Sequence, residues 1–340
     1  MSDFDATLTE ALEFTAAFTP EAFPTLAQHL DPLWVEEALL ATGTATIRRR
    51  RLPADRTVWL VLAMALLRDW PITEVARQLD LALPARDGSR TVASSALTQA
   101  RNRLGSDPME WLFLRTGEEW AGASADRDRW HGLSLFAVDG TTLRVADSVA
   151  NRDHFGSHRA GRHERQGFQP QLLLTSLTDP TRFPAARLRL LYHQRWEIEL
   201  GIGEIKTDML DRLETIRSKS PTAVTQEIWG LLLAYNLVRL EMERIANELK
   251  VEPTRISFLA ALRHFVEQWL WASQTQTPGA IPKRLSTMRD RLRRFLLPPR
   301  RPERWFPRAV KLKMSNYERK HPTTLSAQPL RPRNTPPHRP

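Results

Sequence analysis

Four chemically active residues recur along one predicted helix in the second half of the chain. They are Tyr192, Arg195, Glu199 and Lys206. At about 100° per residue, their side chains fall within about 60° of one another, beside an apolar stripe. A carboxylate flanked by a phenol and two cations suits a metal-bound phosphate, because Mg²⁺ prefers oxygen ligands and cations pair with phosphate oxygens. A solvated surface helix also carries a polar arc and is the alternative interpretation.

A second candidate carboxylate, Asp139, follows an apolar run of strand length. The run is Leu133–Val138, and Gly140 and the β-rich run Thr141–Val145 come directly after Asp139. This pattern predicts two strands with Asp139 at or near a tight connection between them. Leu172–Leu177 is a third short strand candidate.

The first 120 residues read as helices, and two of these helices have helix-turn-helix character. Helices are predicted from Asp31-Pro32 through Leu40 and over Thr57–Leu67, Ile72–Leu79 and Ala96–Leu104. The last of these presents Arg101 and Arg103 on its polar side, as a DNA-reading helix would. Many helical hairpins have polar outer faces, so an ordinary hairpin is the alternative. Three longer helices are predicted further on, over Pro184–Arg212, Pro221–Leu249 and Pro253–Ala272.

The spacing Tyr-x2-Arg-x3-Glu-x6-Lys resembles the signature of DDE transposases of the insertion-sequence-four group. Ala137–Thr142 resembles the strand that carries the first catalytic Asp of that family, and Trp229–Val238 resembles the helix after its Glu. Lys311–Asn316 resembles its basic ending, and the amino-terminal helices resemble its N-terminal domain. The resemblance runs from roughly residue 20 to residue 320.

The resemblance implies a ribonuclease-H-like fold and two-metal phosphoryl transfer. In this family three carboxylates hold two Mg²⁺ ions, with Mn²⁺ as an alternative, for in-line displacement at a phosphodiester. By resemblance, Asp139 is the first catalytic, metal-binding carboxylate and Glu199 is the last. Tyr192, Arg195 and Lys206 would hold transposon-end DNA.

The sequence departs from the family pattern at the second Asp. The family places it after an apolar strand, typically before Arg-Gly-Phe or Arg-Gly-Tyr, and no such motif occurs here. Asp139 and Glu199 are also only 60 residues apart. Asp179 follows an apolar run, but its segment resembles the one just before the Glu helix. We therefore expect an internal deletion with its junction near Gln169–Leu172, and a catalytically defective copy.

The predicted fold class is α+β and mostly helical, in three parts. They are an N-terminal helical, DNA-binding domain over residues 1–125, an incomplete ribonuclease-H-like domain over 130–275, and a basic, Pro/Arg-rich tail over 276–340. From residue 281 to 340 the chain carries 17 Lys and Arg against 3 Asp and Glu, within a net charge of +10. A basic tail typically binds a polyanion, although a solvated chain end is the alternative.

The remaining composition limits the compartments in which the protein is expected and the partners that it is expected to bind. The chain has no cysteine, no apparent signal peptide and no apolar run of membrane-spanning length, so we expect a cytoplasmic protein without a membrane partner. The expected partner is double-stranded DNA at transposon ends, with a homodimer or pairing with an intact transposase as protein assemblies. Two functions stay open: a Mg²⁺-dependent cut-and-paste transposase, and a non-catalytic DNA-binding remnant or inhibitor of transposition. A plain helical DNA-binding regulator is a third.

Overall fold

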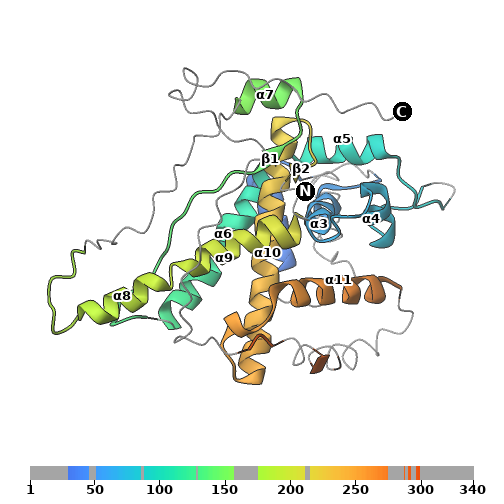
Figure 1. Cartoon of the computed structure of the whole chain (residues 1–340). Helices are drawn as coiled ribbons and strands as arrows, with labels where there is room; N and C mark the ends of the chain where they lie inside the picture. The colour runs from blue at the N-terminus through green and yellow to red at the C-terminus, as the bar shows by residue number, and fades with distance from the viewer. Residues whose placement is uncertain are drawn as a thin grey trace, which may run out of the picture. The chain divides into compact units, whose positions relative to one another are not determined.

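The computed structural model shows a mostly helical chain with one small sheet (Figure 1). It describes residues 30–45, 51–85, 88–127, 129–156, 175–210 and 215–274, together with 287, 290–291 and 296–298. These residues belong to one compact unit that ends at Pro298. The predicted α+β, mostly helical fold class is confirmed.

The amino-terminal part forms five described helices. Two of them show why they begin or end where they do: the Asp31 carboxylate accepts a hydrogen bond from the Leu33 N–H and caps the first, and Gly105, at φ +70°, ends the fourth. The four helices predicted in this region are confirmed to within three residues at each end. The bounds are α2 (Pro32–Ala41), α3 (Ala54–Leu66), α4 (Ile72–Gln78), α5 (Ser94–Leu104) and α6 (Asp107–Arg127).

The carboxy-terminal part confirms two of the predicted long helices and divides the third. The divided helix bends at Gln194 and Arg195 and ends in a π-helical turn. Its pieces are α8 (Ala185–His193), α9 (Trp196–Gly203) and η1 (Glu204–Met209). The other elements are α7 (Val149–Phe155), α10 (Pro221–Leu249), the 3₁₀ turn η2 (Pro253–Arg255) and α11 (Phe258–Gln274).

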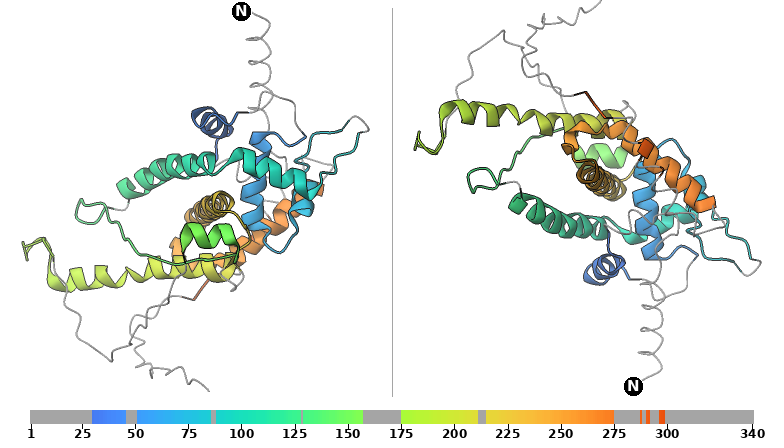
Figure 2. Two further views of the ribbon diagram at one scale, coloured as in Figure 1. Left: turned by 90° about the horizontal axis from the view of Figure 1, so that it is seen from above. Right: turned by 90° about the horizontal axis from the view of Figure 1, so that it is seen from below.

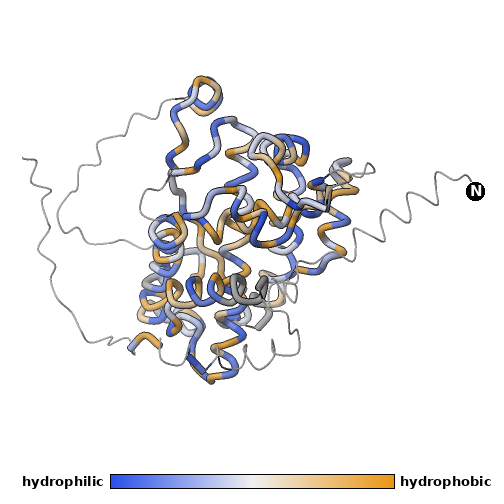
Figure 3. Tube along the Cα trace, turned by 90° about the vertical axis from the view of Figure 1, so that its right-hand side faces the viewer, coloured by the Kyte–Doolittle hydropathy of each residue, from blue (hydrophilic) through white to orange (hydrophobic). Residues whose placement is uncertain are grey.

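Helix α10 lies at the centre of the core. It packs against α3, α6 and α11, and Figure 2 shows it nearly end-on, with α6 on one side and α9 on the other. Gly230 allows the approach to α3, because a Cβ there would lie 2.6 Å from Val61 Cγ1. Hydrophobic and hydrophilic residues alternate along most of the helices, as expected for helices with one buried face (Figure 3).

The predicted strands are largely wrong within the described residues. Leu133–Val138 forms a single bridge, between Trp130 and Leu133, and Phe136 and Val138 are 76% and 96% exposed. An isolated strand leaves its backbone groups unpaired, and in the part of the chain that the structure describes this apolar run has no neighbouring strand.

Only the end of the next predicted run forms a strand. Strand β1 (Arg144–Val145) pairs in parallel with β2 (Thr215–Ile216), where sequence analysis expected no strand. Residues 175–177 form no strand, and 172–174 lie outside the described residues. The predicted domain boundary near residues 125–130 stays a prediction. Buried residues of α3, α5 and α10, from both sides of that boundary, belong to one continuous core. Within the described ranges, every helix is too short or too polar to cross a membrane.

Candidate active site

At the bend between α8 and α9, Arg195 contacts two other signature residues, Tyr192 and Glu199. The Arg195 Nη1 lies 2.8 Å from Glu199 Oε1, and the Arg195 guanidinium lies over the Tyr192 ring at 5.3 Å. The side chains of Arg195 and Glu199 are 41% and 31% exposed. An ion pair this exposed contributes only about 0–1 kcal/mol to stability, so its position at the surface is better suited to binding than to folding. Lys206 lies further along, in η1, and is half-buried.

A second polar network anchors these helices to α10, and sequence analysis missed it. The Tyr235 hydroxyl donates a hydrogen bond of 2.8 Å to Glu204 Oε2, and Arg239 Nη1 lies 3.5 Å from the same oxygen. Gly201 makes room for this contact, since a Cβ there would lie 2.8 Å from the Tyr235 hydroxyl. The available signal was a tyrosine within the apolar run of α10, because a buried hydroxyl needs a partner.

Burial governs the titration of this network. It raises the pKa of the Glu204 carboxyl, and the opposing effects of Arg239 and of the Tyr235 hydrogen bond are smaller. Burial likewise raises the pKa of the Tyr235 hydroxyl, which therefore remains a donor at neutral pH.

The segment that leads into Asp139 lies beside the signature residues. Leu135, Phe136 and Val138 line a pocket of about 450 Å³ together with Tyr192 and Arg195. Asp139 itself is exposed, and its Oδ1 accepts a hydrogen bond from the Gly140 N–H at 2.8 Å. The structure thus places the strand-like run before Asp139 against the end of α8 and the bend.

Among the described residues, no third carboxylate completes a metal-binding group with Asp139 or Glu199. Within the described ranges, no three His, Asp or Glu side chains lie close enough together to hold a metal ion. Asp147 pairs with Arg152 at 2.7 Å, and Asp179 accepts hydrogen bonds from the backbone of Thr181 and Arg182. Asp139 and Glu199 have the oxygen donors that suit Mg²⁺, but they are fewer than the three carboxylates that the resemblance implies.

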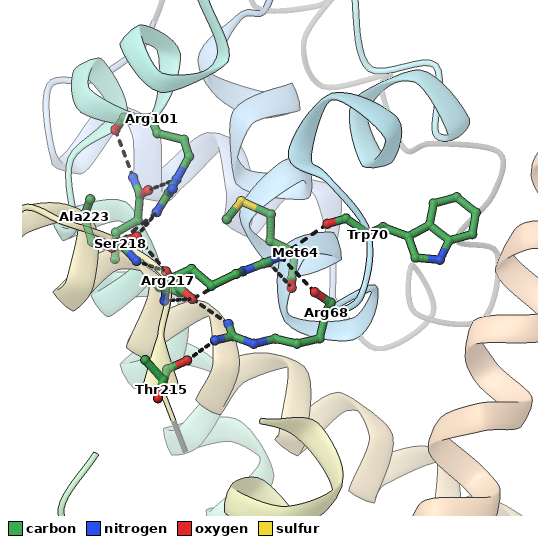
Figure 4. Close-up of polar contacts among 10 residues, drawn as sticks. Met64, Arg68, Trp70, Arg101, Thr215, Arg217, Ser218 and Ala223 are labelled. Atoms are coloured by element: carbon green, nitrogen blue, oxygen red, sulfur yellow. Dashed lines mark hydrogen bonds and ion pairs between the residues drawn. The ribbon is translucent and has the colours of Figure 1, made fainter. Parts of the chain in front are cut away.

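The two arginines predicted to read DNA occupy different environments on α5. Arg103 is exposed, whereas Arg101 donates from Nε to Gln226 Oε1 at 2.9 Å and from Nη2 to the Ser218 hydroxyl at 3.0 Å (Figure 4). Burial lowers the pKa of the Arg101 guanidinium, and the Glu227 charge opposes this shift. Contact of either arginine with DNA stays a prediction.

Comparison with known proteins covers most of the chain. Residues 20–114 match the family model "Insertion element 4 transposase N-terminal", and residues 151–237 match "Transposase DDE domain". The chain is 31% identical to "Transposase InsG for insertion sequence element IS4" of Escherichia coli K12, over 86% of this chain and 92% of InsG. It is also 31% identical to "Putative transposase InsZ" of the same organism, over 95% of this chain and 99% of InsZ. No solved structure matches.

The two alignments differ in their gaps. The InsG alignment spans 415 positions, and 86% of 340 residues is about 292, so about 120 positions are gaps in this chain. The InsZ alignment spans 329 positions. It includes 95% of this chain, which is about 323 residues, so nearly every position is filled by a residue of this chain. This chain therefore lacks residues that InsG has, as the internal deletion predicts, and InsZ aligns almost without such a gap. The expected junction at Gln169–Leu172 lies outside the described residues.

The matched ranges include the signature residues and the amino-terminal helices. The DDE family model covers Tyr192, Arg195, Glu199 and Lys206, and the N-terminal model covers α2 through α5. Two relatives at 31% identity extend the likeness over most of the chain. The chain belongs to the IS4 family of DDE transposases.

Proposed function

We propose that this transposase binds the ends of its insertion sequence as double-stranded DNA, in the bacterial cytoplasm. The observation that carries the proposal is the surface group formed by Tyr192, Arg195 and Glu199, beside the segment that leads into Asp139. A guanidinium at the surface can form paired hydrogen bonds with phosphate oxygens, and a tyrosine ring beside it can pack against sugar or base. Lys206 and Arg103 add positive charge from η1 and α5.

The metal chemistry belongs to the same surface. Asp139 and Glu199 would hold Mg²⁺, or Mn²⁺ in its place, which when bound supplies Lewis-acid stabilisation of a reacting phosphodiester. Arg195 would orient the DNA phosphate, and its pairing with Glu199 would hold that carboxylate in place before DNA arrives. With two carboxylates in place of three, we propose that this copy is catalytically defective.

DNA binding is tested with a labelled duplex of a transposon end and a scrambled duplex of equal length, by fluorescence anisotropy. Affinity for both should fall steeply as salt rises, because each phosphate contact releases a counterion. Deleting Ile281–Pro340 should lower affinity for both duplexes, whereas Arg103→Ala should reduce the preference for the end. Equal affinity of the wild-type protein for end and scrambled duplexes would refute the proposal.

A second function, inhibition of transposition, is favoured by the InsZ alignment. Because InsZ aligns with this chain almost without gaps, the shorter form is not confined to one protein. Such a form could occupy transposon ends or pair with an intact transposase. Co-expression with an intact family transposase should lower the transposition frequency of a reporter element. A variant lacking Ile281–Pro340 is the matched control, and an undiminished frequency with the full chain would exclude inhibition.

A further inference from the structure

A cluster of buried and half-buried polar side chains joins the end of α3, helix α5, the chain after β2 and the second turn of α10. We call it the arginine clamp (Figure 4). Three arginines, one carboxylate, one amide and one hydroxyl form it. Its members are Arg68, Arg101, Arg217, Ser218, Gln226 and Glu227.

Glu227 is the acceptor at the centre of the clamp. Its side chain is 4% exposed, and Arg68 Nη1 donates to Oε1 at 2.5 Å. The backbone N–H groups of Arg217 and Ser218 each donate to the carboxylate at 3.1 Å, and the Ser218 hydroxyl donates at 2.6 Å. Burial alone would raise the pKa of Glu227, but the hydrogen bonds from Ser218 and Arg68 outweigh burial, and its pKa is lowered. The ionised carboxylate therefore fixes the two residues that follow β2.

Two arginines tie the end of α3 to β2 in opposite directions. Arg68, just after α3, donates from Nη2 to the Thr215 carbonyl in β2. Arg217, just after β2, donates to the carbonyls of Arg68 and Trp70 at 2.8 and 3.2 Å, and to that of Met64 at 3.0 Å. These bonds satisfy the Met64 carbonyl in the last turn of α3 and two carbonyls of the chain that follows the helix.

Helix α5 joins the clamp by a reciprocal exchange. Gln226 Nε2 donates to the backbone carbonyls of Arg101 and Gly105, while Arg101 Nε donates to the Gln226 side-chain oxygen. Arg101 Nη2 also reaches the Ala223 carbonyl, at 3.2 Å. The carboxy-terminal turn of α5 is therefore held at a fixed rotation against α10.

The clamp also reaches the segment of the first carboxylate. Strand β2 pairs with β1 in the register Arg144 to Thr215 and Val145 to Ile216, and β1 begins five residues after Asp139. A buried ion cluster contributes little to net stability compared with apolar packing of the same volume, but its directional bonds specify one arrangement.

We propose that the arginine clamp positions α5 for reading DNA, and that Arg101 acts through the placement of this helix. The clamp sets the orientation in which the exposed face of α5, including Arg103, meets DNA relative to the segment of Asp139. Arg101 is then a positioning residue. The proposal rests on the proposed binding of transposon ends.

Glu227→Gln provides the first test, because electrostatics and positioning predict opposite changes in the affinity for the transposon-end duplex. Removing a negative charge among three arginines would, by electrostatics alone, leave DNA affinity equal or higher. The clamp predicts instead that the ratio of end to scrambled affinity falls by about tenfold, while affinity for the scrambled duplex stays within about twofold. Leu262→Ala in α11 is the control, since it removes core packing away from the clamp and should keep the ratio.

Arg101→Lys provides the second test, because it keeps the charge and loses the forked geometry. If Arg101 acts by positioning α5, Arg101→Lys should lower the ratio of end to scrambled affinity. It should not change the slope of log affinity against log salt concentration. A direct phosphate contact predicts instead that Lys keeps most of the affinity for both duplexes, and that Arg101→Ala reduces the slope by about one unit.

Hydrogen exchange of the backbone amides tests, without DNA, whether the arginine clamp holds α5 in place. Glu227→Gln should speed exchange in α5 and in residues 215–218 and leave α11 unchanged. Unchanged exchange in α5, or an unchanged affinity ratio in both clamp variants, would overturn the proposal. A wild-type protein that does not distinguish end from scrambled DNA would instead refute the proposed function, and hydrogen exchange would then decide whether the clamp holds α5.

Discussion

Two glutamates, the buried Glu227 of α10 and the half-buried Glu204 that is hydrogen-bonded to α10, have opposite pKa shifts for a simple reason. Glu227 accepts four hydrogen bonds, one of them from a guanidinium, and its pKa is lowered. Glu204 accepts one short hydrogen bond from Tyr235 and one long one from Arg239 at 3.5 Å, and burial raises its pKa. The number and charge of the donors, and not burial alone, thus decide the direction.

At the residue scale, we predict that Glu204→Gln changes the pH dependence of stability. A folded-state pKa above the unfolded value favours the protonated form, so the stabilisation is present below about pH 4 and is lost as pH rises through the folded-state pKa. Glutamine does not ionise and still accepts the Tyr235 bond. Relative to wild type, the variant should therefore gain stability between about pH 4 and pH 7, as measured by urea unfolding.

Tyr235→Phe is the companion variant, because it removes the donor and keeps the ring. It should lower the free energy of unfolding at pH 7 by about 1 kcal/mol, since the Glu204 oxygen loses its only short hydrogen bond among the described contacts. A difference between Glu204→Gln and wild type that stays constant across this pH range would contradict the assignment of Glu204 as the titrating group.

At the element scale, α10 connects the two parts of the chain that sequence analysis separated. It contacts α3, α5 and α6 from the amino-terminal part and η1, η2 and α11 from the carboxy-terminal part. Both polar networks, the arginine clamp and the Glu204–Tyr235 pair, include side chains of this helix. Its distance from α3 is set where Gly230 meets Val61.

We predict that Gly230→Ala destabilises the protein despite the higher helix propensity of alanine. The added Cβ would lie 2.6 Å from Val61 Cγ1 and 3.4 Å from the Val61 carbonyl oxygen, and overpacking of this kind costs about 1–3 kcal/mol. Gly117→Ala in α6 is the matched control, because nothing lies within 4 Å of its added Cβ. The control should gain about 0.5–1 kcal/mol.

The same contact offers a rescue. Adding Val61→Ala to Gly230→Ala removes the clashing methyl, so the pair should be less destabilising than the sum of the two single changes. Thermal unfolding monitored by circular dichroism measures all four proteins. Strict additivity would show that the close approach of α10 to α3 at this position is not what limits the substitution.

At the scale of the whole molecule, we predict that this copy does not cut DNA. Two-metal transfer needs enough anionic oxygen ligands to hold both ions, and losing one of three carboxylates removes either nucleophile activation or leaving-group stabilisation. Purified protein with Mg²⁺ or Mn²⁺ and a transposon-end duplex should give no nicking, hairpin or strand transfer. Metal-dependent cleavage that disappears in Asp139→Ala would contradict this, and Asp179→Ala would then test Asp179 as the third ligand.

The sequence by itself predicted most of the helices, the family and the signature motif. Helix ends depend on neighbouring residues, such as the Asp31 carboxylate at the start of α2 and Gly105 after α5, and they were therefore predictable. The family follows from the spacing of Tyr192, Arg195, Glu199 and Lys206, which is a property of the chain alone.

The tertiary structure decided what depends on partners far apart in the chain. Among the described residues, Leu133–Val138 has the composition of a strand but pairs only through the bridge at Leu133, whereas β2 pairs with β1. Arg101 looked like a surface residue on a polar helix face, yet its partners Gln226 and Ser218 are more than 100 residues away. A strand and a half-buried cation each need hydrogen-bond partners, and only the folded chain brings distant partners into contact.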